Sequence, residues 1–280
     1  MTEQALSKSK QDVIRYWDKR PCNSGHSSQT IGSLEFHNQV LEKRYFVEPH
    51  ILEFADFKSC KGLRVLEIGS GIGTDAFQFA KFGAIVKSGD ISSRSIEICN
   101  EIKSNLNLGS IDFFCHDFEN PILPIDVAFE PDLIYSFGVI HHSPNPGNVF
   151  KNLSVWAKPG TKVKIMVYSR LSTKAIALYF KYCLKTRFNF DRAVALQSEA
   201  QFGSPYTYTY THRKIKKILT SSNVKVKKIY KRHIFSYRVA EYKENVYIKR
   251  LYWRFLPKSV FDRFERLLGW HLLIEGEISE

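Results

Sequence analysis

The chain has 280 residues, of which 44% are hydrophobic and 25% charged, a composition that predicts a globular protein with a sizeable core and excludes a disordered or fibrous one. Its formal net charge is +13, and most of the excess lies after residue 170. An anionic substrate, a membrane surface or a nucleic acid would each suit that basic part. No apolar run approaches the ~20 residues of a membrane span, and the polar first 20 residues lack a signal-peptide core. Five dispersed cysteines without a CxxC pair indicate free thiols in a reducing cytosol.

Residues 1–58 predict an N-terminal helical cap. Residues 2–19 have the spacing of a short amphipathic helix, which Pro21 ends. A loop is predicted over 21–33, and a helical stretch interrupted at Pro49 over 34–57.

Residues 59–170 alternate short apolar strands with helices. Strands are predicted at 63–69, 84–90, 111–117, 131–138 and 161–169, and helices at 74–82, 93–106 and 147–157. Such alternation implies right-handed crossovers and a parallel sheet covered on both faces. Ligands of these sheets bind beyond the carboxyl ends of the strands.

Residues 171–280 predict a looser C-terminal part that completes the sheet and carries lid insertions. The predicted segments are helices at 172–186 and 190–200, an extended segment at 204–211, a half-exposed strand at 224–235, a basic and aromatic stretch at 237–268, and a last apolar run at 271–277.

The stretch "VLEIGSGIGTD" (65–75) places three glycines at a strand-to-helix turn. In dinucleotide-binding domains such a turn reads GxGxxG and receives a pyrophosphate. Here the spacing is GxGxG, and Glu67 precedes the first glycine by two residues. A carboxylate at this place would repel a pyrophosphate and suits a ligand with an ammonium group.

Two further carboxylates follow the next strands. Asp90 ends the second predicted strand, where an acidic residue can accept both hydroxyls of a ribose. Asp117 ends the third, where it could meet an adenine amino group. Adenosine joined to an amino acid, without phosphate, describes S-adenosylmethionine. Simpler roles remain open: a tight turn for the glycines, a helix N-cap for Asp90, a turn residue at Asp117 and a core position for Phe137.

With "GDIS", "CHDF", "DLIYSFGVIHHSPNP" and "WAKPGTKVKIMVY" added, residues 60–170 resemble a class I S-adenosylmethionine-dependent methyltransferase, of the broad group that includes ubiquinone- and menaquinone-biosynthesis-type enzymes. The resemblance implies an α/β, Rossmann-like fold: a seven-stranded, mostly parallel sheet with helical N-terminal and C-terminal additions. It implies S-adenosyl-L-methionine as cofactor and S-adenosyl-L-homocysteine as product. The cofactor-binding residues it implies are Glu67, Gly69, Ser70, Gly71, Gly73, Asp90, Ile91, Asp117, Phe118, Phe137 and Gly138.

His141 and His142 are the candidate catalytic residues, because an imidazole suits proton removal near neutral pH. Adjacent residues of an extended segment point to opposite sides, so only one of the two histidines could face the site. The alternative for each is a structural role. No metal site is predicted, since a histidine pair together with His116 fits no metal-ligand spacing.

The acceptor pocket is expected to be lined from outside the matched core. The candidate substrate-binding residues are Tyr16, Trp17, Asn23, His26, Tyr45, Tyr206, Tyr208 and Tyr210. Period-two spacing would place the last three on one face of a strand. Packing is the alternative for each of them.

We therefore expect a cytoplasmic enzyme that transfers a methyl group to a small-molecule acceptor. An alternative is a membrane- or lipid-linked acceptor, reached by peripheral contact of the basic C-terminal part with an anionic membrane. Nucleic acid is not an expected partner, because no nucleic-acid-binding module is present. Two other classes stay open: an NAD(P)-dependent oxidoreductase and a non-catalytic scaffold. The sequence sets neither the acceptor, nor the methylated atom, nor the oligomeric state.

Overall fold

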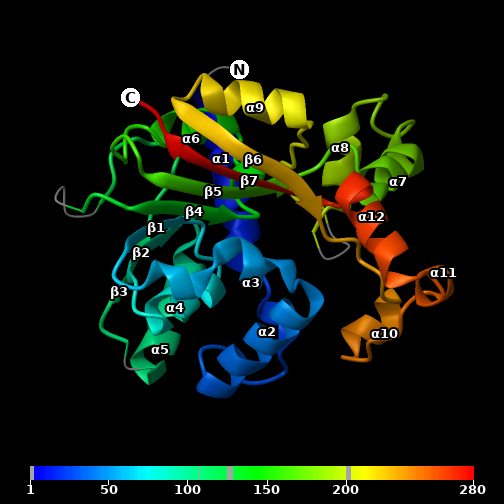
Figure 1. Ribbon diagram of the computed structural model, residues 1–280, viewed down its shortest axis with the longest axis horizontal. Coiled ribbons are helices and arrows are strands. Elements are labelled where there is room, and N and C mark those ends of the chain that lie inside the picture. Colours follow the sequence, from blue (N-terminus) through cyan, green and yellow to red (C-terminus); the bar gives the residue numbers. More distant parts are fainter. Residues whose placement is uncertain (1–2, 107, 125–128, 200–202) are drawn as a thin grey trace.

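A twisted seven-stranded sheet forms the centre of the computed structural model, which describes residues 3–106, 108–124, 129–199 and 203–280 (Figure 1). The strand order is β3-β2-β1-β4-β5-β7-β6. The strands are β1 (Arg64–Ile68), β2 (Ile85–Asp90), β3 (Ile111–Cys115), β4 (Leu133–Phe137), β5 (Lys162–Tyr168), β6 (Val224–Arg232) and β7 (His271–Ile278). The ends of each strand lie within about three residues of their predicted positions.

Strands β1 to β5 pair in parallel, and β7 pairs antiparallel with both β5 and β6. The predicted seven-stranded, mostly parallel sheet is therefore confirmed. The parallel strands bring Ile68, Asp90, Cys115 and Phe137 to the same edge of the sheet. That edge is where the candidate site residues gather.

The two faces of the sheet bury separate apolar cores. Val65, Leu133 and Tyr135 pack with one set of helices, α2 to α5, whereas their strand neighbours Leu66 and Ile134 pack with α6 and α9 on the other face. This alternation follows from the two-residue period of a strand. Continuous buried runs, such as residues 65–68 of β1, arise because both faces of the sheet are covered.

The helices of the N-terminal and central parts are α1 (Glu3–Lys19), η1 (Ser24–His26), α2 (Leu34–Val47), α3 (His50–Ala55), η2 (Phe57–Cys60), α4 (Thr74–Lys81), α5 (Ser93–Leu106) and α6 (Pro146–Asn152). Pro49 lies between α2 and α3 and interrupts the helical stretch, as predicted. The helix predicted over 147–157 ends earlier, at Asn152. Trp156 lies in the turn that follows, where its Nε1 donates to the Pro121 carbonyl at 2.7 Å.

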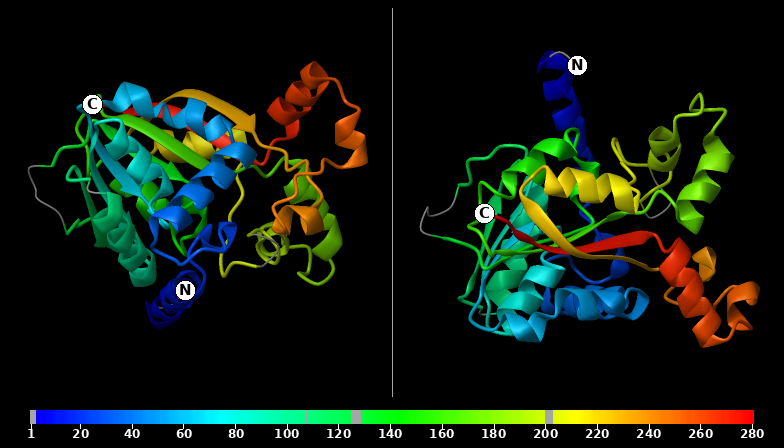
Figure 2. Two further views of the ribbon diagram at one scale, coloured as in Figure 1. Left: turned by 90° about the horizontal axis from the view of Figure 1, so that it is seen from below. Right: turned by 45° about the horizontal axis from the view of Figure 1, so that its top comes forward.

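The C-terminal part adds helices around the end of the sheet. They are α7 (Thr173–Tyr182), α8 (Phe190–Ala195), α9 (His212–Thr220), α10 (Val239–Lys243), α11 (Leu251–Arg254) and α12 (Lys258–Leu268). Figure 2 shows α7 and α8 together beyond one end of the sheet, with α10 to α12 as a second group beside them. No helix among the described residues is long and apolar enough to cross a bilayer.

Candidate active site

The glycine turn between β1 and α4 is held in a conformation that other residues rarely adopt. Gly69, Gly71 and Gly73 have φ of 86°, 51° and 78°. A Cβ on Gly69 would lie 2.1 Å from Val139 Cγ2, and one on Gly73 would lie 2.6 Å from the Phe77 ring. The backbone N–H groups of Gly69 and Ser70 donate to the Gly89 carbonyl, at 2.7 and 2.9 Å. The turn is therefore fixed against the end of β2.

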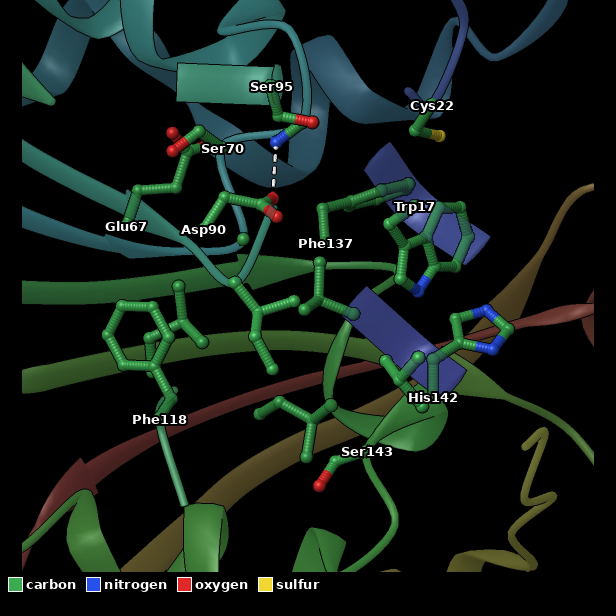
Figure 3. Close-up of a pocket in the computed structure, with 18 of the residues that line it drawn as sticks. Trp17, Cys22, Glu67, Ser70, Asp90, Ser95, Phe118, Phe137, His142 and Ser143 are labelled. Carbon is green, nitrogen blue, oxygen red and sulfur yellow. Dashed lines mark hydrogen bonds between the residues drawn. The ribbon is translucent and has the colours of Figure 1, made fainter. Parts of the chain in front are cut away.

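Asp90 lies beside this turn at the end of β2. Its carboxylate accepts from the backbone N–H of Gly71 and of Ser92, each at 2.9 Å (Figure 3). Burial raises the pKa of Asp90 to about 6, although these backbone donors act in the opposite direction. Each oxygen keeps a lone pair for a ligand, which is what a ribose diol requires.

Asp117 lies beyond β3 and is paired with a residue of α1. Lys10 Nζ lies 2.6 Å from Asp117 Oδ2 and 2.9 Å from Glu119 Oε2. Farther along α1, the Asp18 carboxylate accepts from Ser92 Oγ at 2.7 Å. These contacts hold α1 over the ends of β2 and β3.

A buried polar network lies next to Glu67. Ser88 Oγ donates to Glu67 Oε2 at 2.5 Å, and burial raises the pKa of Glu67 well above its usual value. Asp75, in the first turn of α4, accepts from Arg44, and the hydroxyls of Tyr45 and Tyr135 lie 2.9 Å from its two oxygens. Arg44 Nε has no hydrogen-bond partner among the described residues. One buried guanidinium donor thus remains free at the pocket wall.

These groups surround one pocket that opens to solvent. Figure 3 shows Asp90, Ser70, Phe137, Trp17 and His142 around it. The predicted residues that line it are Trp17, Asn23, Glu67, Gly69, Ser70, Gly71, Asp90, Ile91, Asp117, Phe118, Phe137, Gly138 and His142. Gly73 does not line the pocket, and its place is the start of α4.

Several lining residues were not predicted, among them Cys22, Arg44, Asp75, Ser95, Glu119 and Ser143. Arg44 lies in the middle of an ordinary helical pattern, so nothing local distinguishes it. Asp75 closes the quoted glycine motif, and an acidic residue in the first turn of a helix is the usual arrangement there. The sequence gives no sign that Asp75 contacts Arg44, which lies 31 residues away in the chain.

The two candidate histidines have different environments. His142, in the short helix η3 (Ile140–His142), lines the pocket, and its ring lies edge-on to Trp17 with centroids 5.3 Å apart. His141 is fully buried away from the pocket, against Tyr168. Only His142 is therefore placed to meet a ligand.

The structure does not bring most of the candidate substrate-binding aromatics to the pocket. Tyr16 packs edge-on against Trp17, Tyr45 donates to Asp75, and His26 lies beside Tyr242. Tyr206 and Tyr208 stack on each other, and Tyr210 is buried in a bridge to Ser169. Thr207, between Tyr206 and Tyr208, is buried next to His142. It therefore takes the inward-facing position that was predicted for these two tyrosines.

The strand order, the glycine turn and the carboxylates at the ends of β1, β2 and β3 define a class I, Rossmann-like methyltransferase fold. The family model described as a methyltransferase domain matches residues 59–226, more than half of the chain. The chain belongs to this methyltransferase family, and the cofactor of the class is S-adenosylmethionine. The resemblance expected from the sequence is confirmed, and an oxidoreductase is not favoured.

Among curated proteins, the ubiquinone biosynthesis O-methyltransferase of Coxiella burnetii (strain RSA 493 / Nine Mile phase I) is 31% identical over 127 residues, which are 45% of this chain and 53% of that protein. Phosphoethanolamine N-methyltransferase 2 of Caenorhabditis elegans is 33% identical over 126 residues, 43% of this chain and 26% of that protein. The matches thus span about half or less of these relatives.

Solved structures share the fold over nearly the whole chain. Magnesium protoporphyrin IX methyltransferase of Synechocystis PCC 6803, solved with S-adenosylhomocysteine, has a TM-score of 0.58 at 14% identity and covers 97% of this chain and 100% of its own. Geranyl diphosphate C-methyltransferase of Streptomyces coelicolor A3(2) has a TM-score of 0.59 at 11% identity, with 96% and 98% covered. At such identities the likeness describes the fold alone.

Proposed function

We propose that this protein transfers the methyl group of S-adenosylmethionine to a small-molecule acceptor bound in the same pocket. The observation that carries the proposal is the alignment of Asp90, the glycine turn and Arg44 along one pocket. They offer a diol acceptor, a backbone that a ligand can approach closely, and a carboxylate-binding guanidinium. The relatives methylate oxygen, nitrogen or carbon according to their names, so the acceptor atom stays open.

The residues present fit the cofactor from end to end. Asp90 would accept the ribose hydroxyls, and Asp117 would accept from the adenine amino group once Lys10 shares its carboxylate. Glu67 and the glycine turn would hold the ammonium group. The free Nε of Arg44 would donate to the cofactor's carboxylate. When bound, the cofactor supplies an electrophilic methyl group on a sulfonium.

His142 is the residue that we propose to remove a proton from the acceptor, where the acceptor must lose one. Its Nδ1–H donates to the Tyr206 carbonyl at 2.8 Å, which leaves the lone pair on Nε2. Nε2 lies 3.3 Å from Glu199 Oε1, and Glu199 also accepts from the Tyr168 hydroxyl at 2.7 Å. Although burial acts to raise it, His142, Lys174 and Tyr168 lower the pKa of Glu199 to about 2. Glu199 faces the same nitrogen, so the imidazolium that forms when Nε2 takes a proton from the acceptor would be paired directly with this carboxylate.

The basic C-terminal helices support a second proposal, peripheral contact with an anionic membrane that carries the acceptor. Around α11 and α12 the exposed apolar side chains are Leu251, Tyr252, Phe255, Val260, Phe264 and Leu267. Arg254, Lys258, Arg263 and Arg266 lie exposed among them. Apolar and basic side chains together on short helices are typical of interfacial binding.

Calorimetric titration with S-adenosylhomocysteine and with adenosine tests the cofactor assignment. Asp90→Ala is expected to weaken binding of both ligands, because both carry the ribose. Arg44→Met is expected to weaken S-adenosylhomocysteine by about tenfold or more and to leave adenosine unchanged, because adenosine has no carboxylate. Equal loss of both ligands in Arg44→Met would remove Arg44 from the carboxylate role, and no binding by the wild type would overturn the proposal.

A further inference from the structure

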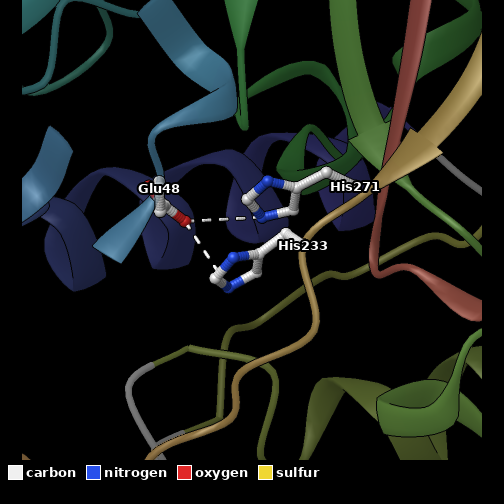
Figure 4. A group of neighbouring side chains, drawn as sticks. All are labelled: Glu48, His233 and His271. Atoms are coloured by element: carbon white, nitrogen blue, oxygen red, sulfur yellow. Dashed lines mark ion pairs between the residues drawn. The ribbon is translucent and has the colours of Figure 1, made fainter. Parts of the chain in front are cut away.

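A buried group of one carboxylate and three imidazoles lies beside the cofactor pocket. Glu48 ends α2, His50 begins α3, His233 follows β6, and His271 begins β7. Glu48 Oε1 is 3.6 Å from His271 Nε2 and 3.8 Å from His233 Nε2 (Figure 4). One ligand atom from each of these three residues lies within 4.8 Å of the other two. Three segments that are distant in the chain, at residues 48–50, 233 and 271, thus converge on one point.

We propose that Glu48, His233 and His271 bind a divalent transition metal ion. Two imidazoles and one carboxylate form a donor set that Zn²⁺ and Fe²⁺ accept, whereas Mg²⁺ and Ca²⁺ prefer oxygen ligands alone. Three protein ligands leave a fourth position open to water or another oxygen donor.

The fourth residue, His50, fits the role of a supporting partner. His50 Nε2 lies 2.9 Å from His271 Nδ1. With the His271 Nδ1–H as donor, the Nε2 of His271 keeps its lone pair, and that is the atom next to Glu48. Metal-binding histidines usually donate their other N–H in this way, which fixes the ring and its tautomer.

The protonation states of the cluster agree with metal binding. Burial lowers the pKa of His233 to about 3 and holds the pKa values of His50 and His271 well below their usual range, so the imidazoles are neutral. The nearby cations Lys174, Arg232 and Arg44 act in the same direction. Burial raises the pKa of Glu48 to about 7, although Arg44 opposes this. Metal binding at this site uses the ionised carboxylate and the neutral imidazoles.

Closing the three ligands on one ion requires a rotation of the histidine rings. The rings of His233 and His271 stack with centroids 4.5 Å apart and planes 23° apart, whereas metal–nitrogen bonds of ~2.0–2.1 Å need lone pairs that converge. His233 has the freedom for this, because it lies outside β6 at the wall of a second pocket. His50, Glu53 and Glu265 line the same pocket, which gives a cation a route from solvent.

The proposed ion would lie one side chain away from the cofactor. His271 packs edge-on against the Phe137 ring, with centroids 5.4 Å apart, and Phe137 lines the cofactor pocket. Glu48 lies one helical turn after Arg44, and its backbone N–H donates to the Arg44 carbonyl. The cluster and the pocket are therefore connected at the end of α2 and through the contact of His271 with Phe137.

Zinc titration of the full chain after chelator treatment tests the site, with a chromophoric chelator as competitor. We expect one tightly bound ion per chain. Glu48→Gln and His233→Ala, both at partly exposed side chains, should each weaken binding by more than ~100-fold, and His50→Phe by ~10–100-fold. His212→Ala, on the exposed surface of α9, is the control and should leave zinc affinity unchanged.

The visible absorption spectrum of bound Co²⁺ is a second measurement, and it depends on the metal ligands and not on folding alone. Co²⁺ in the wild type should show the visible absorption of a low-coordinate nitrogen and oxygen site, and His233→Ala should lose it. Equal zinc affinity in the wild type and His233→Ala, or a cobalt spectrum like that of the aqueous ion, would overturn the site. S-adenosylhomocysteine binding by the metal-free protein is measured alongside, so that failure of the metal site and failure of the cofactor pocket are distinguished.

Discussion

We expect Asp90 to make cofactor binding sensitive to pH. Its pKa in the folded chain is about 6, raised by burial above that of an exposed aspartate, and the ribose hydroxyls need the ionised form. Affinity is therefore expected to be highest above pH 6 and to fall as the pH drops through 6, approaching about tenfold for each unit. Calorimetry with S-adenosylhomocysteine between about pH 5 and 8 measures this. Asp90→Asn, which cannot titrate, should bind weakly with a flat profile, and an unchanged slope in that variant would assign the effect to another group.

Variants of His142 and His141 compare the proposed general base with a neighbouring histidine that is buried away from the pocket. Replacing His142 by Gln is expected to lower kcat by ~10²–10⁴-fold for an acceptor that must lose a proton, because the only pocket-facing imidazole of the pair is lost. His141→Gln should change kcat far less, since His141 is buried against Tyr168. The measurement is the pH profile of kcat with an identified acceptor. Equal losses in the two variants, at matched stability, would point to a structural role for both.

Single residues also mark the limit of what the sequence could predict about the site. Asp90, Gly69 and Gly71 stand at strand ends within a recognisable spacing, so their place at the pocket could be predicted. Arg44, Glu199 and the Glu48 cluster could not, because their partners lie in distant segments and the chain around each follows an ordinary pattern. The tyrosines of 204–211 were predicted at a pocket that they do not line, since the facing set of an extended segment depends on its neighbours.

At the level of elements, the β1–α4 turn depends on the absence of a side chain at Gly69. Gly69→Ala is expected to destabilise the fold by ~2–5 kcal/mol, combining the cost of a positive φ with the overlap against Val139. Gly62→Ala is a matched control, because Gly62 has φ of 77° and its added Cβ would meet nothing within 4 Å. That variant should lose only ~1–2 kcal/mol. Urea unfolding compares them, and equal losses would show that Val139 moves aside at little cost.

Local sequence patterns predicted the helices and strands of the central part well and those of the C-terminal part less well. Buried parallel strands have long apolar runs, so β1 to β5 were predicted within a residue or two. The helices α10 to α12 were described only as a basic, aromatic stretch, although Val260, Phe264 and Leu267 of α12 recur at helical spacing. The helix predicted to reach residue 200 ends at Ala195, and residues 200–202 lie outside the described ranges.

For the whole molecule, the surface around α11 and α12 predicts binding to vesicles. The wild type is expected to pellet with liposomes rich in anionic lipid at low salt and to be released as salt rises, since the basic side chains contribute through screened charges. Leu251→Glu with Phe255→Glu should reduce pelleting strongly. Ile122→Glu with Val155→Glu, at two other exposed apolar positions, is the charge-matched control. No pelleting by the wild type, or equal loss in the control, would contradict peripheral membrane contact.

The position of β7 has a consequence for how the chain is built. Strand β7 is the last to be synthesised, yet it lies between β5 and β6 and pairs with both. Until residues 271–278 leave the ribosome, β6 has no neighbour to join, and β5 presents an unpaired edge. The first five strands can assemble early in translation, whereas the other two must wait until residues 271–278 have been synthesised. The nascent chain therefore carries an open sheet edge through the synthesis of about a hundred residues, from β5 to β7, a period in which a chaperone or a neighbouring chain could pair with it.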